Sequence, residues 1–462
     1  MQLKQGMQAV VIGLGTAGLS TVKFLLRQGL RVAVSERGTI DQIDPYVLKF
    51  LQQSAIRIET GGHSAAFLVG ADVVIPGPGV PLSLPIIRAA REQGLPIMGE
   101  LALAAGRYSV PVIAVTGSNG KTTVTSLIGT LLQMGGKTPF VGGNIGRPLL
   151  DYFADPGPYA TVVLELSSFQ LDLAGAFRPD VGLLLNISPD HLDRHGSLSA
   201  YTAAKMNLFG AQVVGDVAIL GGDDPVADAA PLNGGVLGFW FGKEERCAAR
   251  IIDGQVRVRL ERSGVACEEM YDLAGTRLHS SVNQLNAAAA ILAATLCNCS
   301  REAITAGLAA FEPPPHRMAE VGEIDGVRFI NDSKATNIGA LQAALGGCTS
   351  PVILIAGGRD KGGDYTLLQE VVRAKVKHLV LVGEAAALME AALGTVVGTE
   401  SATTMADAVR KAKAAAVSGD LVLLAPGCAS YDMFSGYEER GRVFAECVHQ
   451  LRREPTGKEA EP

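Results

Sequence analysis

The chain has 462 residues, enough for three domains at about 100–200 residues each. Its 40 Lys and Arg residues are outnumbered by 46 Asp and Glu residues, which gives a net charge of −6. This balance argues against a nucleic-acid-binding protein, because neutralising phosphates requires a basic surface. A hydrophobic content of 48% and a total of 55 glycines exclude wholesale disorder and indicate an α/β chain rich in turns.

Two further features indicate where the chain works. The longest window without charge, residues 280–300, contains an apolar stretch of only residues 287–297, which is too short to span a bilayer. The 7 cysteines form no CxxC pair and are typical of reduced thiols. We therefore expect a cytoplasmic protein that does not insert into membranes.

The first hundred residues alternate apolar runs with helical patterns, which predicts a doubly wound α/β domain. The expected strands are residues 9–13, 31–35, 71–76 and 96–98. A glycine loop at residues 13–18 follows the first strand and opens a helix, and Glu36 ends the next strand. This arrangement fits a dinucleotide site, but the same loop also suits another nucleotide diphosphate, such as a UDP-linked substrate.

Changes in pattern divide the rest of the chain. A new strand at residues 110–116 follows a connector-like stretch at 99–109. The three prolines at 313–315 end an Ala-rich helix, because proline cannot continue one, and another alternating unit follows them. We predict three α/β domains: a Rossmann-like N-terminal domain (1–106), a central P-loop domain with a mixed or parallel sheet (107–312) and a Rossmann-like C-terminal domain (313–462).

The strongest local signal is a phosphate-binding loop between the strand at 110–116 and a helical pattern at 124–134. The loop reads Gly117, Ser118, Asn119, Gly120, Lys121, Thr122, Thr123. Small residues let backbone N–H groups face phosphate oxygens at a helix N-terminus, while Lys121 suits the outer phosphates and Thr122 a Mg²⁺ ion. Val115 stands where the usual eight-residue pattern has glycine, so this is a shortened form of the motif. The loop predicts that a nucleoside triphosphate binds.

Polar residues at other strand ends are candidates for the chemistry. Glu165 ends an expected strand and His191 follows another, so both should lie at the carboxyl edge of the sheet, where ligands gather. Glu165 is a suitable oxygen ligand for Mg²⁺ beside Thr122, whereas imidazole is a less usual one and a structural histidine is the alternative for His191. By itself, Lys205 reads as a solvated lysine on a helix face.

The last unit carries three polar loops, at residues 331–337, 357–361 and 426–432, and each follows an expected strand. Runs of small polar residues at strand ends make a poor core and a good binding site. Their cations and hydroxyls suit an anionic substrate.

Together these motifs resemble the Mur ligases of peptidoglycan synthesis, over residues 13–441. Motifs of the kind shared across Mur-type ligases stand at residues 116–123, 165–170, 186–195, 283–286 and 316–317. Residues 331–337, Lys361 and residues 428–434 look like those of the members that add D-glutamate. The resemblance implies a three-domain, ATP-dependent amide ligase that adds D-glutamate to UDP-N-acetylmuramoyl-L-alanine.

The resemblance also implies roles for single residues. In the first domain, it implies that the glycine loop binds the UDP-linked substrate rather than NAD. The UDP-substrate residues are Gly15, Thr16, Ala17, Ser35, Glu36, Arg37, Gly79 and Asn144. The ATP residues are Gly117, Ser118, Asn119, Gly120, Lys121, Thr122, Thr123, Asn283, Arg317 and Asp332. The D-glutamate residues are Lys334, Thr336, Lys361, Ser430 and Tyr437. The ligands of two Mg²⁺ ions are Thr122, Glu165, His191 and Lys205, with Lys205 carbamylated to a carboxylate, and the catalytic residues are Lys121, His191 and Lys205.

The chain departs from the family's usual residues at a few places. Val282 replaces the histidine of a His-Asn pair, Gly77 replaces the serine of a Ser-Pro-Gly motif, and Tyr437 replaces a phenylalanine. The first change weakens the case for a functional residue at position 282, and the others affect the rims of substrate pockets.

The implied mechanism follows from the chemistry of a carboxylate, which resists attack by an amine because its leaving group would be oxide. The L-alanyl carboxylate first takes the γ-phosphoryl group of ATP to form an acyl phosphate, and the amine of D-glutamate then displaces phosphate. We expect domain closure to exclude water from the acyl phosphate, and a monomer acting on small molecules. Alternatives are another Mur-type or a folylpolyglutamate-type ligase, a dehydrogenase, and a non-catalytic nucleotide-binding regulator.

Overall fold

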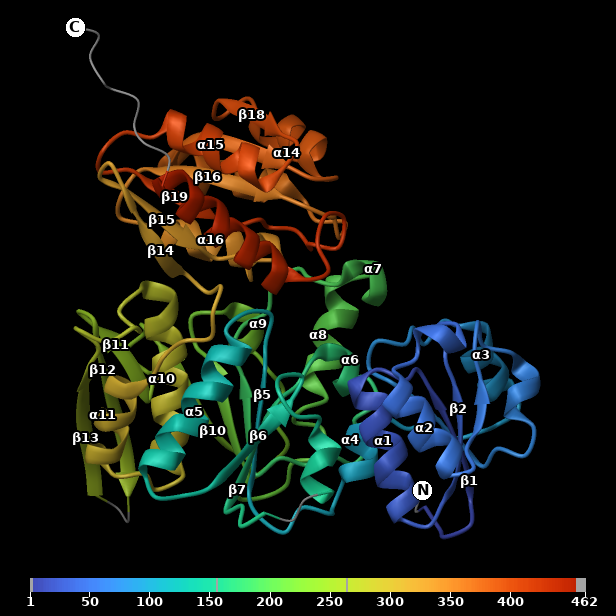
Figure 1. Cartoon of the computed structure of the whole chain (residues 1–462). Coiled ribbons are helices and arrows are strands. Elements are labelled where there is room, and N and C mark those ends of the chain that lie inside the picture. The colour runs from blue at the N-terminus through green and yellow to red at the C-terminus, as the bar shows by residue number, and fades with distance from the viewer. Residues whose placement is uncertain (1–2, 155–156, 263–264, 454–462) are drawn as a thin grey trace, which may run out of the picture. The chain divides into compact units, whose positions relative to one another are not determined.

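The computed structural model describes residues 3–154, 157–262 and 265–453, which form three β-sheets with helices packed around them (Figure 1). The chain divides into two compact units. The first unit comprises Met1–Ile187, Thr202–Thr276 and Leu285–Phe311, and the second comprises Ser188–Tyr201, Arg277–Gln284 and Glu312–Pro462. The first unit contains two of the sheets and the second unit contains the third.

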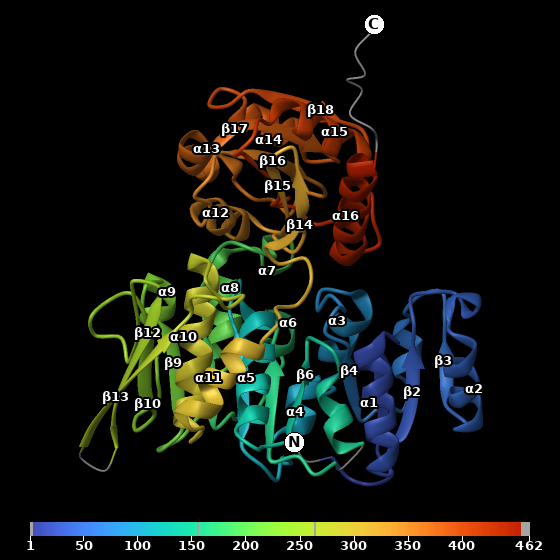
Figure 2. The ribbon, with the colours of Figure 1, turned by 60° about the vertical axis from the view of Figure 1, so that its left-hand side comes forward.

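The first sheet has the strand order β3-β2-β1-β4, and all its strands are parallel. Its strands are β1 (Gln8–Ile12), β2 (Arg31–Ser35), β3 (Arg57–Glu59) and β4 (Val73–Pro76). Its helices are α1 (Thr16–Arg27), η1 (Ile40–Gln42), α2 (Pro45–Gln53), η2 (Ala65–Leu68) and α3 (Pro85–Glu92), of which α1, α2 and α3 are labelled in Figure 2. Three expected strands are confirmed, but residues 96–98 form only an isolated bridge from Ile97 to Val74. Sequence reasoning missed β3, which is only 3 residues long and has a charged residue at each end.

The central sheet has the order β13-β12-β11-β10-β9-β8-β5-β7-β6, parallel from β6 to β11 and antiparallel beyond. Its strands are β5 (Val112–Thr116), β6 (Pro139–Gly143), β7 (Thr161–Glu165), β8 (Val181–Leu184), β9 (Val217–Gly221), β10 (Leu237–Gly242), β11 (Ala249–Ile252), β12 (Gln255–Arg262) and β13 (Val265–Asp272). The mixed sheet is therefore confirmed. The phosphate-binding strand β5 lies between β7 and β8, so the loops after these three strands meet at one edge.

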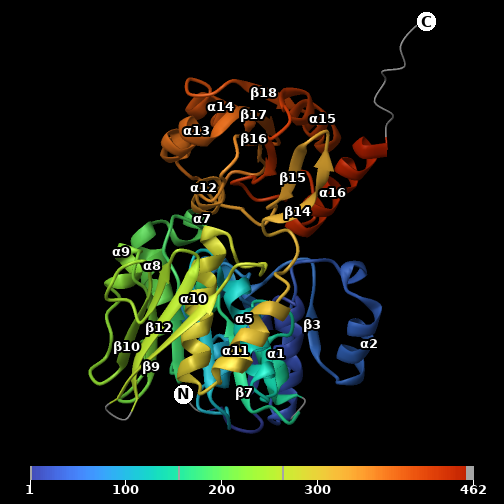
Figure 3. The ribbon, with the colours of Figure 1, turned by 90° about the vertical axis from the view of Figure 1, so that its left-hand side faces the viewer.

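The helices of this part of the chain begin with the connector helix α4 (Glu100–Ala104), so the expected connector is partly helical. The others are α5 (Lys121–Met134), η3 (Leu149–Phe153), α6 (Ser168–Leu171), α7 (Leu192–His195), α8 (Leu198–Met206), α9 (Pro225–Asp228), α10 (Ser281–Leu296) and α11 (Arg301–Ala310). Helix α11 packs closely on α5, because a Cβ at Gly307 would come within 2.6 Å of Leu131. Helix α10 lies beside them (Figure 3).

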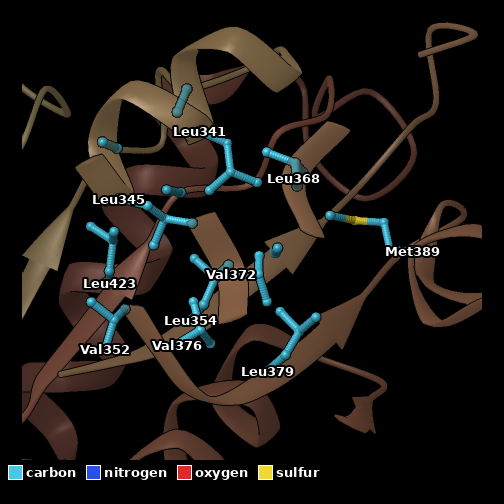
Figure 4. Packing of buried hydrophobic residues seen from close by; sticks show 14 of the residues in the cluster. Leu341, Leu345, Val352, Leu354, Leu368, Val372, Val376, Leu379, Met389 and Leu423 are labelled. Carbon is cyan, nitrogen blue, oxygen red and sulfur yellow. The ribbon is translucent and has the colours of Figure 1, made fainter. Parts of the chain in front are cut away.

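The third sheet has the order β14-β15-β19-β16-β17-β18 and is parallel except for the edge pair β14–β15. Its strands are β14 (Ala319–Ile324), β15 (Val327–Asn331), β16 (Val352–Gly357), β17 (Val376–Val382), β18 (Thr399–Ala402) and β19 (Leu421–Leu424). Its helices are α12 (Ile338–Gly346), η4 (Tyr365–Leu368), α13 (Gln369–Lys375), α14 (Ala386–Leu393), α15 (Met405–Ala415) and α16 (Tyr437–Arg453). One face is covered by a buried cluster that includes Leu341, Leu345, Leu354, Leu379 and Leu423 (Figure 4). Strands β15, β19 and β16 are neighbours, so the three polar loops predicted as a binding site share one edge.

Candidate active site

The phosphate-binding loop has the geometry that its sequence predicts. Strand β5 ends at Thr116, and α5 begins at Lys121 after Gly120, which has a φ of +86°. Any Cβ at Gly120 would overlap the side-chain oxygen of Asn286, so this position requires glycine for both conformation and space. Asn186, after β8, holds the loop: its Oδ1 accepts from Asn119 N at 2.8 Å and its backbone oxygen accepts from Ser118 N at 2.9 Å. The N-terminus of α5, which begins at Lys121, is the part of this loop where a phosphate is expected to bind.

Two lysines reach the same loop. Lys121 Nζ donates to the backbone oxygens of Gly117 and Ser118, at 2.8 Å and 2.9 Å. Lys205 Nζ donates to the backbone oxygen of Gly117 at 2.8 Å, and the Lys205 side chain is only 1% exposed. From the residues alone Lys205 read as a solvated lysine, which is wrong: α8 directs it into the protein beneath the loop. Sequence spacing on α8 could not reveal this, because the partner lies 88 residues away.

Glu165 lies beside this loop and is poised to bind a cation. It ends β7, pairs in register with Val115 of β5, and is only 2% exposed. Its Oε1 accepts from Asn144 Nδ2 at 2.9 Å, while its Oε2 is buried with no hydrogen-bond partner among the described residues. An orphaned buried carboxylate oxygen fits a Mg²⁺ ligand. No group of three His, Cys, Asp or Glu side chains in the described ranges could hold a metal, so an ion here would share its coordination with other oxygens.

A cavity of about 430 Å³ lies at the carboxyl edge of the first sheet. Five of the predicted UDP-substrate residues line it: Gly15, Thr16, Ala17, Gly79 and Asn144. The other predicted residues lie outside this lining: Ser35 ends β2, and Glu36 and Arg37 follow it. Glu36 faces the glycine loop, since its Oε2 accepts from Leu14 N at 2.6 Å. Gln170 also lines the cavity, and sequence reasoning assigned it no role.

In the second unit, His191 and Lys361 are brought together by Asp190. Asp190 Oδ1 accepts from Lys361 Nζ at 3.0 Å, its Oδ2 accepts from Asn337 Nδ2 at 2.9 Å, and the same oxygen lies 3.7 Å from His191 Nε2. Burial alone would raise the pKa of Asp190, but the charges of Lys361 and His191 and the hydrogen bonds from Asn337 and Lys361 outweigh it and lower that pKa. The acid therefore stays ionised. Sequence reasoning missed Asp190 although it stands next to His191.

The predicted D-glutamate residues divide into two groups. Thr336 and Lys361 line one small cavity together with Asp190. Lys334 lies elsewhere, with its Nζ 3.9 Å from the centre of the Tyr437 ring, a cation–π contact. Ser430 is 2% exposed and stands in the loop after β19.

Two of the loops that carry these residues, at 331–337 and 426–432, are held by Arg440 of α16, which is 2% exposed. Its guanidinium donates to Ser333 Oγ at 3.0 Å, to the Ser333 backbone oxygen at 2.8 Å, and to the backbone oxygens of Cys428 and Ala429 at 3.1 Å and 3.2 Å. Burial lowers its pKa to about 10. Nothing in the sequence around Arg440 signals this role, because its partner Ser333 lies 107 residues away and its other partners are backbone oxygens.

The remaining predicted ATP residues also lie in the second unit. Asp332 follows β15 and is 9% exposed; burial raises its pKa to about 6, against the effects of the Met318 N–H and the charge of Arg317. Asn283 lies in the first turn of α10, where its Nδ2 donates to the backbone oxygen of Arg277 at 3.4 Å. Arg317 is thus close enough to Asp332 to lower its pKa against the effect of burial.

The fold and the loop define a class of protein: a three-domain α/β protein with a P-loop in its central domain. Family models agree with this class: the Mur ligase MurD-like N-terminal domain matches residues 7–99, the Mur ligase middle domain 115–294, and the Mur ligase glutamate ligase domain 316–428. Among curated proteins, the UDP-N-acetylmuramoylalanine--D-glutamate ligase of Desulfotalea psychrophila is 44% identical over 96% of both chains. The protein of the same name from Syntrophotalea carbinolica is 37% identical over 97% of this chain and 98% of its own.

Solved structures agree in fold. A pseudomurein peptide ligase type C from Methanothermus fervidus superposes with a TM-score of 0.61 at 18% identity, over 96% of this chain and 100% of that one. A MurF ligase from Thermotoga maritima, solved in complex with ADP, gives a TM-score of 0.59 at 18% identity, over 97% of this chain and 96% of that one. The chain belongs to the Mur ligase family. Within the described residues, no helix is long and apolar enough to cross a membrane.

Proposed function

We propose that this chain is an ATP-dependent ligase that joins the amine of D-glutamate to the L-alanyl carboxylate of UDP-N-acetylmuramoyl-L-alanine. The observation that carries the proposal is the similarity to ligases of that name over nearly the whole chain, at 44% and 37% identity. The phosphate-binding loop with Lys121 and the buried Glu165 supports it, because this is the arrangement that a phosphoryl transfer needs.

The reaction needs ATP because a carboxylate has no good leaving group. The L-alanyl carboxylate attacks the γ-phosphorus, the bond from that phosphorus to the bridging oxygen breaks, and ADP leaves. The amine of D-glutamate then attacks the acyl carbonyl, loses a proton, and phosphate departs as the amide forms. Lys121 and the N–H groups at the start of α5 offset the charge of the transferring phosphoryl group.

Mg²⁺ would bind at the orphaned oxygen of Glu165, with Thr122 as the second protein ligand. When bound, the metal supplies charge stabilisation at the phosphoryl oxygens. A second ion, held by His191 and a carbamylated Lys205, belongs to the proposal as well. The position of Lys205 suits it, because a carbamate formed on its buried amine would put a carboxylate beneath the phosphate-binding loop.

The remaining assignments follow the same proposal. The cavity at the first sheet would take the UDP-linked substrate, and Asn283, Arg317 and Asp332 would bind ATP. Lys334, Thr336, Lys361, Ser430 and Tyr437 would bind D-glutamate, with Asp190 holding Lys361 in place. The domain boundaries of this proposal are residues 1–106, 107–312 and 313–462 in a monomeric chain.

Phosphate release tests the proposal. The full chain is incubated with ATP, Mg²⁺ and UDP-N-acetylmuramoyl-L-alanine, and D-glutamate, L-glutamate, L-alanine or a diamino acid is added in turn. We expect release with D-glutamate alone, and none from a Lys121→Ala variant, which loses the cation that offsets the phosphoryl charge. Release with another amino acid would make the chain a different Mur-type ligase. No release with any of them would favour a nucleotide-binding regulator.

A further inference from the structure

A second buried carboxylate, Glu100, is hydrogen-bonded to a residue that lines the cavity of the first unit. Glu100 is the first residue of the connector helix α4 and is 5% exposed. Its Oε1 accepts from Gln170 Nε2 at 2.6 Å, and its Oε2 is buried with no hydrogen-bond partner in the described ranges. The helix is held close to this site, because a Cβ at the preceding Gly99 would come within 2.7 Å of Leu173. Burying a carboxyl group that has an unpaired oxygen costs folding free energy.

The carboxamide of Gln170 is fixed from both ends. Its Oε1 accepts from Ser167 N at 2.8 Å and from Ser167 Oγ at 3.0 Å, which forms a capping box at the start of α6. A backbone N–H can only donate, so the oxygen must face Ser167 and the NH₂ group must face Glu100. A carboxamide has two N–H donors, and Glu100 accepts one of them.

Gln170 also lines the cavity of about 430 Å³ that carries the glycine loop and Asn144. The two carboxamides are anchored alike, since Asn144 Nδ2 donates to the buried Glu165 and Gln170 Nε2 donates to the buried Glu100. Glu165 also lies beside the phosphate-binding loop, whereas Glu100 accepts its hydrogen bond from Gln170. An oriented amide suits a ligand rich in hydroxyl, amide and carboxylate oxygens.

We propose that Glu100 is a positioning residue for the UDP-linked substrate: by holding the carboxamide of Gln170, it aims that group at the acylated sugar portion of the substrate. This inference rests on the proposed function. It assigns to a residue of the connector helix a role in substrate affinity, although Glu100 itself is not among the residues that line the cavity.

Two substitutions of Glu100 and one of Gln170 test the proposal. Glu100→Gln keeps an oxygen that accepts from Gln170, so its KM for the UDP-linked substrate should stay within about threefold of wild type. Glu100→Leu removes the acceptor and leaves the carboxamide of Gln170 without its partner, so the KM for this substrate should rise roughly tenfold or more. The KM values for ATP and D-glutamate should not change. If Glu100→Leu does not fold, Glu100→Asp shortens the side chain by one methylene and gives the same comparison.

The double variant separates positioning from a structural role. Because Glu100 acts through Gln170, Glu100→Leu combined with Gln170→Ala should resemble Gln170→Ala alone, whereas independent structural damage would add. An unchanged KM in Glu100→Leu, or additive effects, would overturn the inference. Calorimetric binding of UDP-N-acetylmuramoyl-L-alanine to the full chain gives the comparison without turnover. Failure of the wild type to release phosphate would therefore count against the proposed function and leave this inference to be decided by the change in Kd.

Discussion

In the first unit, two side chains at the candidate site bear the free-energy cost of burying a carboxylate. Glu100 and Glu165 are both buried carboxylates, and each has one oxygen with no hydrogen-bond partner in the described part of the chain. Burial raises the pKa of Glu100 to about 7; the hydrogen bond from Gln170 opposes this and the charge of Asp151 adds to it. Folding therefore favours the protonated form of Glu100 over a range in which the unfolded chain has already lost that proton.

This difference predicts how stability changes with pH. Below pH 4.5, the ordinary value, Glu100 is protonated in both states. Between pH 4.5 and about 7 the unfolded chain has lost this proton while the folded chain keeps it, so stability falls with rising pH across this window and levels off above it. The loss amounts to at most about 3 kcal/mol at roughly 1.4 kcal/mol per pH unit. Urea unfolding between pH 5 and pH 8 should thus show Glu100→Gln gaining stability relative to wild type as pH rises. Because Asp332 titrates in the same direction, only the difference between the two proteins is informative, and a difference that stays constant with pH would contradict the prediction.

For single residues, the sequence predicts a function where the residues that act together are neighbours in the chain. The phosphate-binding loop could be predicted because its glycines, lysine and hydroxyls are consecutive, and the structure places Lys121 on that loop as expected. Asp190, Lys205 and Arg440 could not, because each acquires its function from a partner at least 88 residues away. Their side chains carry no local sign of whether they are exposed or buried.

Among the elements, the first turn of α16 organises the polar loops of the third sheet. Tyr437 accepts from Ser333 Oγ through its backbone oxygen at 2.8 Å, and the Gly441 backbone oxygen accepts from Asn331 Nδ2 at 2.8 Å. Arg440 lies between these contacts and adds the loop after β19. One helix end therefore fixes two of the loops that carry the proposed D-glutamate residues.

Arg440→Lys tests this arrangement. A lysine keeps the charge but has no planar fork, so it cannot serve Ser333 and the oxygens of Cys428 and Ala429 together. We expect a loss of about 1–3 kcal/mol in unfolding free energy from buried acceptors left unpaired. The KM for D-glutamate should also rise roughly tenfold, while the KM for the UDP-linked substrate stays unchanged. Arg442→Lys is the matched control, since Arg442 lies two positions after Arg440 on the same helix, is exposed and pairs with Glu446. Equal behaviour of the two variants would show that Arg440 does not organise the loops.

Element boundaries show where pattern reasoning succeeds. Strands buried on both faces, such as β5, β16 and β19, are continuous apolar runs, and all three were expected within three residues of their ends. Strand β3 was missed because charged and partly exposed residues dominate its short length. The antiparallel pair β12–β13 has several charged residues in each strand and likewise gives no apolar run.

For the whole molecule, alternation of strands and helices was enough to predict three α/β domains, because each sheet is built from a continuous stretch with local helical crossovers. No local sequence pattern could predict which residues make up each of the two compact units. Residues 188–201 and 277–284 group with the last part of the chain although they lie within the sequence of the central sheet. His191 and Asn283 therefore belong to the second unit together with Arg317 and Asp332, although they lie at a distance from these two residues in the sequence.

The proposed reaction predicts where the carboxylate oxygens of the UDP-linked substrate go. If the chain activates the L-alanyl carboxylate as an acyl phosphate, one carboxylate oxygen must leave with the phosphate when the amide forms. With both carboxylate oxygens of UDP-N-acetylmuramoyl-L-alanine labelled with ¹⁸O, each molecule of released phosphate should contain one ¹⁸O atom, and the nucleotide product should be unlabelled ADP. Mass spectrometry of phosphate and nucleotide measures both. Label in AMP would mean that the carboxylate attacks the α-phosphorus instead, and unlabelled phosphate would mean that water, not the substrate, receives the phosphoryl group.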